Sequence, residues 1–475
     1  MINETDYSNN PLTKEQENKI DSMFAEYDNT DSPGFAIGVI KEGSFIYKKS
    51  LGMANLDYQI PVSSDTSFHM GSVTKQFTAA CVALLILDGK LGVNDDIRKY
   101  LPDMPDYGHI INIGNLIHHT SGIRDSCMLT MLGRFMGGEF IFDDIVTDLI
   151  YRQKKICFLP GDKYSYSNSN YQLLTKIVEN VSGVTIAEFA KERLFKPLGM
   201  DNTLFADNCY KIRKNRANGY FLMNSDEDKY CPGSKKGEYL VLPHINQNVG
   251  ETNLVTTMND LLKWTNNFMY ATLGRDFVDL MLTKGKLNNG EEIDYAFGNN
   301  IIIYKGHKCI CHAGETTGFY ASILHLPNKK LSVILLQNCI DLYNSKRKIQ
   351  DVFLDVIDEE PVLEDIKKNE KDNSGLSKFD LGKYCGRYYS YELNVFYEIK
   401  LIKEKLTILL NDKFNDALEI HEEGVLTFNY GWQVYLDFNK SCSENTDSFL
   451  LYADGHGGGL RDIEFVRTNL GLRKI

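Results

Sequence analysis

The stretch that decides the fold is GSVTKQFTAACVALLIL, residues 71–87. A glycine before a serine and a long apolar run after a lysine predict a buried helix that begins near Ser72. Ser72 and Lys75 are three residues apart, so they share one helical face. Serine is a poor nucleophile until a base removes its proton, and burial beside a positive helix end lowers the pKa of Lys75 toward that role. The alternative for Ser72 is an ordinary serine N-cap.

Two later motifs supply further polar groups. The turn-rich loop PGDKYSYSN, residues 160–168, leads into an amphipathic helix that continues through residues 171–178. Its Tyr166 offers a phenol for proton transfer and its Asn168 an amide that could hold a substrate carbonyl. The stretch CHAGETTGF, residues 311–319, places small residues where a substrate backbone could lie against a strand edge.

Taken in order, Ser-x-x-Lys, Tyr-x-Asn and His-x-Gly resemble the motifs of the serine β-lactamase-like hydrolases. The similarity is to the branch that includes class C β-lactamases, DD-peptidases, D-aminopeptidases and esterases. It extends over about residues 15 to 345 and includes four supporting stretches: LIHHTSGI (116–123), the Pro160–Gly161 loop, LFKPLGM (194–200) and NLVTTMNDL (253–261).

The resemblance implies an acyl-enzyme mechanism. Ser72 attacks the substrate carbonyl, and Lys75 and Tyr166 share the acid and base work, with the choice of base left open. Asn168 orients the substrate amide, and His312 supports Tyr166 or the leaving group. Gly314 and Glu315 belong to the substrate-binding strand. The backbone N–H groups of Ser72 and Glu315 match the oxyanion-hole positions.

Two departures from the family pattern concern the substrate. His312 stands where many relatives have lysine, and a mostly neutral histidine holds a substrate carboxylate less well. Glu315 either points to solvent or adds a negative charge near the anionic end of a β-lactam. In the second case it favours a neutral ester or an amine-bearing peptide, so we expect peptidase or esterase activity rather than efficient β-lactam hydrolysis.

Composition sets broader limits. The chain has 475 residues, 43% hydrophobic and 24% charged, with a formal net charge of −12. These values are typical of globular proteins and argue against a nucleic-acid or anionic-membrane surface. The N-terminal residues show no secretory signal, and the apolar run at residues 77–87 is too short to span a bilayer. The ten cysteines show no disulfide-like pattern, so we expect reduced thiols in a cytoplasmic protein; the alternative is a cell-envelope protein whose leader was removed. No metal or nucleotide motif is visible, and no cofactor is expected.

Strand patterns at both ends of the first 340 residues, with helices between, predict an α+β fold. We expect one antiparallel sheet with helices packed on it plus a helical subdomain, followed by a small all-β barrel. The hydrolase domain is assigned to residues 1–357, a charged linker to 358–376, and an antiparallel barrel to 377–475. The barrel resembles the lipocalin-like tail domain of some of these hydrolases. It either holds a small ligand, is filled by its own side chains, caps the active site or mediates a homo-oligomer.

The function expected from these observations is serine hydrolysis of D-amino-acid-containing peptides or small esters. A β-lactamase or DD-carboxypeptidase proper is the alternative within enzymes. A penicillin- or muropeptide-binding sensor that is acylated without turnover is the alternative from another class.

Overall fold

The computed structural model describes residues 12–133, 142–223, 226, 233–243, 248–304, 306–340, 381–402, 405–410, 414–422, 424–429, 432–440, 448–454 and 459–468. The expected linker, residues 358–376, lies outside the described residues. The structure therefore leaves the expected boundaries at 357 and 377 as predictions.

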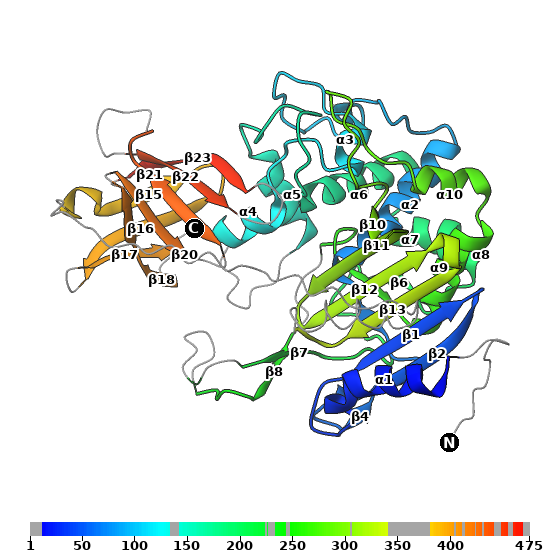
Figure 1. The fold of residues 1–475 in the computed structure, drawn as a ribbon. Coiled ribbons are helices and arrows are strands. Elements are labelled where there is room, and N and C mark those ends of the chain that lie inside the picture. The colour runs from blue at the N-terminus through cyan, green and yellow to red at the C-terminus, as the bar shows by residue number, and fades with distance from the viewer. Residues whose placement is uncertain are drawn as a thin grey trace.

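A six-stranded antiparallel sheet forms the centre of the first part of the chain (Figure 1). The first strand of this sheet along the chain and the last one lie side by side in its interior, with Phe35 opposite Gln337. Two hairpins account for four of the strands, as the sequence predicts. In sheet order the strands are β10 (Asn300–Tyr304), β11 (His307–Thr316), β12 (Phe319–Leu326), β13 (Leu331–Gln337), β1 (Phe35–Lys41) and β2 (Ser44–Leu51).

Helices cover both faces of this sheet. Every residue of β13 is buried, a pattern typical of a strand with cover on both sides. On one face, α1 (Lys14–Phe24) packs Ile20 and Phe24 against the strands. On the other face lies the larger core, which includes α2 (Thr74–Leu87) and α9 (Met258–Tyr270).

The region between β2 and β10 is mainly helical, with three small sheets that sequence reasoning did not resolve. Its other helices are α3 (Ile113–Ile117), α4 (Ser126–Gly133), α5 (Asp143–Tyr151), α6 (Asn168–Ser182), α7 (Ile186–Ala190), α8 (Lys196–Leu198) and α10 (Arg275–Met281). Single turns occur at η1 (Ala25–Tyr27), η2 (Gly71–Val73), η3 (Ile97–Lys99), η4 (Lys191–Phe195) and η5 (Pro327–Lys329). The small sheets pair β3 (Met53–Asn55) with β4 (Ile60–Pro61); β5 (Phe68–His69) and β6 (Leu204–Phe205) with β9 (Leu254–Thr256); and β7 (Gly219–Leu222) with β8 (Tyr239–Leu242) and β14 (Cys339–Ile340).

The C-terminal part is a nearly closed antiparallel barrel that follows the turn η6 (Leu381–Tyr384). The first and last strands of the barrel along the chain pair with each other. The two strands at the edges of the sheet follow one another in sequence and are joined at Leu418, so the sheet curls back on itself. The strands are β15 (Gly386–Ser390), β16 (Val395–Ile402), β17 (Lys405–Leu410), β18 (Phe414–Ala417), β19 (Glu419–Glu422), β20 (Val425–Asn429), β21 (Gln433–Asp437), β22 (Ser448–Asp454) and β23 (Leu460–Arg467). Six of these nine strands are predicted from period-two patterns.

The barrel interior is filled by buried side chains such as Tyr388, Ile408 and Phe465. Three members of this core come from outside the barrel: Met128, Leu129 and Leu132 of α4. Figure 1 shows α4 at the junction between the two parts of the molecule. The described part of the barrel therefore shares its core with a helix of the first part of the chain.

Candidate active site

The predicted nucleophile, Ser72, lies in the turn η2, immediately before α2. Two hydrogen bonds to the neighbouring strand β9 hold this turn: the Met70 backbone amide donates to the Leu254 carbonyl at 2.9 Å, and the Leu254 backbone amide donates to the Thr74 side-chain Oγ1 at 3.0 Å. The N-cap of α2 is Val73, so Ser72 is not the capping residue. Its hydroxyl is available to other partners.

Two glycines bring β11 against this turn. Gly71 has a φ of +50°, and a Cβ on it would lie 2.3 Å from the Glu315 amide nitrogen. A Cβ on Gly314 would lie 2.1 Å from the Met70 carbonyl oxygen and 2.5 Å from the Ser72 amide nitrogen. Only glycine fits at either position, because any side chain would push the strand and the turn apart. The backbone amides of Ser72 and Glu315 are thereby brought into one neighbourhood.

Lys75 is fully buried beside Ser72. Its Nζ donates to Ser72 Oγ at 3.2 Å, to Asn168 Oδ1 at 2.7 Å and to the Glu251 carbonyl oxygen at 2.9 Å. Burial lowers the pKa of Lys75 to about 8, although the carboxylates of Glu251 and Asp125 oppose the shift. This lowering of the Lys75 pKa is the shift expected from the sequence. The sequence did not predict the two buried carboxylates beside Lys75.

Tyr166 lies on the loop before α6, with its hydroxyl buried next to the Ser72 side chain. The hydroxyl makes no hydrogen bond of ordinary geometry to a described residue. Burial raises the pKa of Tyr166, and the contact with Ser72 only partly offsets the effect. The Tyr166 ring packs against the His119 ring at a tilt of 34°, with centroids 4.3 Å apart, and Lys75 Nζ lies 5.1 Å from the Tyr166 centroid. Tyr166 is therefore a neutral phenol that can donate a proton.

His312 is buried in β11 and has a defined tautomer. Its Nδ1 lies 2.7 Å from the Ala313 carbonyl oxygen, which can only accept, so Nδ1 carries the hydrogen. Its Nε2 then accepts from the Tyr295 hydroxyl at 3.1 Å. Burial lowers the pKa of His312 to about 4, and the positive charge of Lys75 contributes. His312 is thus neutral at physiological pH, and its ring centroid lies 6.3 Å from that of Tyr166.

Asn168 is the first residue of α6, and its backbone amide is hydrogen-bonded to the Asp125 carboxylate. The Asn168 amide donates to Asp125 Oδ2 at 2.6 Å, while Asp125 Oδ1 accepts from the Met128 amide at 3.1 Å. Burial raises the pKa of Asp125, and these two amides oppose the shift. Because the Asn168 side chain accepts from Lys75, Asp125 acts on the lysine through Asn168 as well as through its charge.

Glu251 completes the buried cluster and is only 2% exposed. Its Oε1 accepts from Asn248 Nδ2 at 2.7 Å and its Oε2 from Ser126 Oγ at 3.1 Å. Burial raises the pKa of Glu251 to about 7, with Lys75 opposing the shift. Sequence reasoning missed Glu251, Asp125 and Tyr295. The only local signal for Glu251 is its position two residues before the NLVTT stretch, and for Asp125 its position just after LIHHTSGI.

Glu315 presents its side chain to the surface, because alternation along β11 buries His312, Gly314 and Thr316 instead. Burial raises the pKa of Tyr320 to about 12, and the Glu315 charge adds a smaller contribution in the same direction. The carboxylate therefore lies at the rim of the site rather than among the buried groups around Lys75.

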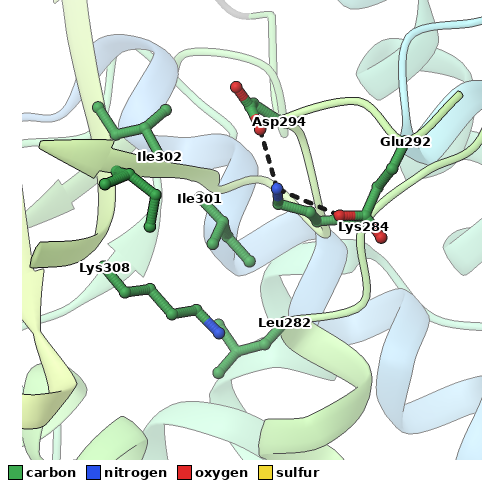
Figure 2. A pocket seen from close by; sticks show the side chains of 8 residues that line it. Leu282, Lys284, Glu292, Asp294, Ile301, Ile302 and Lys308 are labelled. Atoms are coloured by element: carbon green, nitrogen blue, oxygen red, sulfur yellow. Dashed lines mark hydrogen bonds and ion pairs between the residues drawn. The ribbon is translucent and has the colours of Figure 1, made fainter. Parts of the chain in front are cut away.

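A separate hollow of about 650 Å³ lies beside the strand β10 (Figure 2). In it Lys284 donates to Asp294 at 2.9 Å and pairs with Glu292 at 3.3 Å. None of the predicted site residues lines this hollow. Among the residues that the structure describes, no cluster of histidine, cysteine and acidic side chains is arranged to hold a metal ion. Within the same residues, no helix is long and apolar enough to cross a bilayer.

The sequence of this chain is similar to those of known proteins. The chain is 28% identical over 313 residues to a D-aminopeptidase of Gluconobacter oxydans, covering 64% of this chain and 56% of that protein. It is 29% identical over 315 residues to penicillin-binding protein 4* of Bacillus subtilis, covering 62% and 66%. The chain thus spans about three fifths of the length of the curated relatives it matches.

Solved structures show the same fold at lower identity. An octameric penicillin-binding protein homologue from Pyrococcus abyssi matches 95% of this chain and 99% of its own, with a TM-score of 0.62 at 22% identity. A D-amino acid amidase from Ochrobactrum anthropi matches 72% of this chain and 99% of its own, with a TM-score of 0.59 at 19% identity. The family model described as beta-lactamase matches residues 20–346. The chain therefore belongs to the beta-lactamase family of serine acyl-transfer proteins and carries an additional C-terminal barrel.

Proposed function

We propose that this protein is a serine hydrolase that cleaves D-amino-acid-containing peptides or small esters through an acyl-enzyme on Ser72. The observation that carries the proposal is the pair formed by Lys75 Nζ and Ser72 Oγ, 3.2 Å apart, in which Lys75 is fully buried and Ser72 is half-buried. Burial holds the pKa of Lys75 near 8, so a useful fraction of the amine is neutral near physiological pH. A neutral amine can take the serine proton.

In the proposed reaction, Ser72 Oγ forms a bond to the substrate carbonyl carbon while its proton passes to Lys75 Nζ. The negative oxygen of the tetrahedral intermediate accepts from the amides of Ser72 and Glu315. The bond to the leaving group then breaks, and the Tyr166 phenol donates a proton to the departing amine or alcohol and regains one from Lys75. Water releases the acid product by the reverse sequence. The raised pKa of Tyr166 makes tyrosinate a costly base, which supports Lys75 in that role.

Charge around the site supports the choice of substrate. Among the side chains placed around Ser72, Lys75 is the one cation, and His312 is neutral. Asp125 and Glu251 lie below, and Glu315 lies at the rim. Such a site attracts a free amino group and offers little to a substrate carboxylate. The D-aminopeptidase relatives are consistent with this preference, and the amine-bearing D-peptide is therefore the proposed substrate.

A chromogenic panel tests the proposal. Nitrophenyl esters, D- and L-aminoacyl anilides and a cephalosporin are assayed with wild type and with Ser72→Ala. We expect turnover of a D-aminoacyl anilide or an ester, lowered roughly 10³-fold or more by Ser72→Ala. Turnover that survives the substitution contradicts the proposal.

The same panel separates the alternatives. Preferential hydrolysis of the cephalosporin, or release of a C-terminal D-alanine from a DD-peptide, assigns a β-lactamase or DD-carboxypeptidase. A stoichiometric adduct on Ser72 without product release assigns a sensor.

Assembly and location are further proposals. We propose a homo-oligomer formed through the barrel, in a cytoplasmic protein; the Pyrococcus abyssi homologue is described as octameric. Light scattering on the purified protein measures the assembly, and a monomer contradicts it. Cell fractionation measures the location.

A further inference from the structure

The segment from Arg124 to Gly133, here called the bridging segment, contacts both the barrel and the catalytic centre. It consists of Arg124, Asp125 and the helix α4. No residue of this segment belongs to the motifs from which the site was predicted. Its contacts show what the barrel contributes.

On the barrel side, Arg124 is almost fully buried in a set of hydrogen bonds. Its Nη1 donates to Glu392 Oε2 at 2.6 Å, in an ion pair whose side chains are 1% and 6% exposed. Its Nη2 donates to the carbonyl oxygens of Arg461 and Asp462 at 2.5 and 3.1 Å. Glu392 lies in the turn between β15 and β16, and Arg461 and Asp462 lie at the start of β23, so one arginine joins two separate segments of the barrel.

The rest of α4 is held by apolar packing. Met128, Leu129 and Leu132 belong to the barrel core, and Tyr397 Oη donates to the Leu132 carbonyl oxygen at 3.0 Å. A Cβ on Gly133 would lie 2.8 Å from the Leu393 carbonyl oxygen, so the helix end lies tight against the barrel. Both ends of the bridging segment are thus fixed by barrel residues.

On the catalytic side, three consecutive residues of the same segment hold the surroundings of Lys75. The Arg124 carbonyl oxygen accepts from Ser169 Oγ at 2.6 Å, and Asp125 Oδ2 accepts from the Asn168 amide at 2.6 Å. Ser126 Oγ donates to Glu251 Oε2 at 3.1 Å. Asn168 and Glu251 in turn each accept a hydrogen bond from Lys75 Nζ. The path from the barrel to the lysine is short and made of buried polar contacts.

We propose that Glu392 of the barrel is a positioning residue for the catalytic centre. By pinning Arg124 it fixes Asp125 and Ser126, and through them the groups that surround Lys75. The barrel is then a working part of the hydrolase rather than an appended module. The catalytic consequence rests on the proposed function, whereas the structural consequence does not.

The test compares Glu392→Gln with Glu398→Gln in the full chain. Glu398 is also a barrel carboxylate in an ion pair, 2.8 Å from Lys400, but this pair is partly exposed and lies on strand β16. Hydrogen exchange is measured on peptides that contain the amides of Asn168 and Met128, both of which donate to Asp125. We expect Glu392→Gln to speed their exchange about tenfold, as weakening a hydrogen bond to a charged group implies, and Glu398→Gln to leave it unchanged.

The rate of Ser72 acylation by a fluorescent penicillin is measured on the same samples. We expect Glu392→Gln to lower the acylation rate constant of the folded protein about tenfold, and Tyr397→Phe, a milder change at the other end of α4, to lower it about twofold. If Glu392→Gln lowers the thermal midpoint but leaves exchange at Asn168 at the Glu398→Gln level, the contact is merely structural and the proposal is overturned. If Glu392→Gln fails to fold, Tyr397→Phe decides by the same criterion. If wild type forms no adduct with penicillin or ester probes, the proposed function fails, and the exchange comparison still decides the positioning role.

Discussion

Two lysines of this chain each lie near a pair of carboxylates, yet their pKa values shift in opposite directions. Lys284, in the hollow of Figure 2, contacts Glu292 and Asp294, and those hydrogen bonds raise its pKa above the ordinary value. Lys75, beside Ser72, has Glu251 and Asp125 as charged neighbours, yet its pKa falls to about 8. The difference is burial: the Lys284 side chain is 23% exposed with partners at 53% and 66%, whereas Lys75 is fully buried. Acidic neighbours alone stabilise an ammonium, and it is desolvation that makes a lysine into a base.

The largest expected effect is the difference in acylation rate between a variant without Lys75 and one without Lys284. Lys75→Met should lower the rate of Ser72 acylation about 10³-fold, because it removes the proposed general base. Lys284→Met removes an equivalent charge beside a different hollow and should change the rate less than twofold. Equal losses in both variants would show that the lysines act only through overall charge.

The pH dependence of wild type should be the next largest effect. The proposed base is the neutral Lys75 amine, whose fraction falls tenfold for each pH unit below its pKa. With a pKa of about 8, acylation at pH 6 should be about 100-fold slower than the plateau above pH 9. His312, with a pKa of about 4, should contribute nothing in this range. Stopped-flow acylation across pH 5.5–10 measures the acidic limb of the pH–rate profile, that is, the fall in rate below the pKa of Lys75. A flat profile above pH 6 would argue against Lys75 as the base.

Removing one acidic neighbour of Lys75 should have a smaller effect on the pH dependence of acylation. The Glu251 carboxylate raises the pKa of Lys75, so Glu251→Gln should lower that pKa further and move the acidic limb to lower pH. The rate at pH 6, relative to the plateau, should rise about threefold or more, the equivalent of half a pKa unit. Glu292→Gln, the matched change beside Lys284, should leave the limb in place. A limb that moves to higher pH would contradict the sign of this electrostatic effect.

The smallest effect concerns stability at the exposed lysine. Lys284→Met should change the free energy of unfolding by no more than about 1 kcal/mol, as is usual for ion pairs near the surface. Urea denaturation at two salt concentrations measures it, and a much larger loss would show that the hollow is more enclosed than its exposed side chains indicate.

Most of the central sheet could be predicted from the sequence, because its strands are apolar runs joined by short turns, such as Phe319–Leu326 with Leu331–Gln337. The spacing of Ser72 and Lys75 could be predicted too, because a helix brings residues three apart together. In the barrel, β18, β19 and β21 were missed: Phe414–Ala417 and Glu419–Glu422 are only four residues each, mix polar and apolar residues, and rely on their neighbours for pairing.

The surroundings of Lys75 could not be predicted in the same way. Glu251 and Asp125 are separated from Lys75 by 176 and 50 positions, and a lone carboxylate in a sequence carries no sign of burial. The packing of α4 against the barrel could not be predicted either, although its sequence SCMLTMLG has no charged face, as expected of a helix that is covered on most sides. Glu315 is exposed, which is the solvent-facing one of the two orientations that sequence reasoning left open.

The central claim is that burial makes Lys75 a base, and its titration tests this most directly. Protein labelled with ¹³C at the lysine ε carbons is followed by NMR from pH 6 to 11, with the Lys75 and Lys284 signals identified from the two methionine variants. The account predicts that the Lys75 signal titrates near pH 8, while Lys284 titrates above the ordinary lysines. A Lys75 signal that titrates with the surface lysines near pH 10.5 would contradict it.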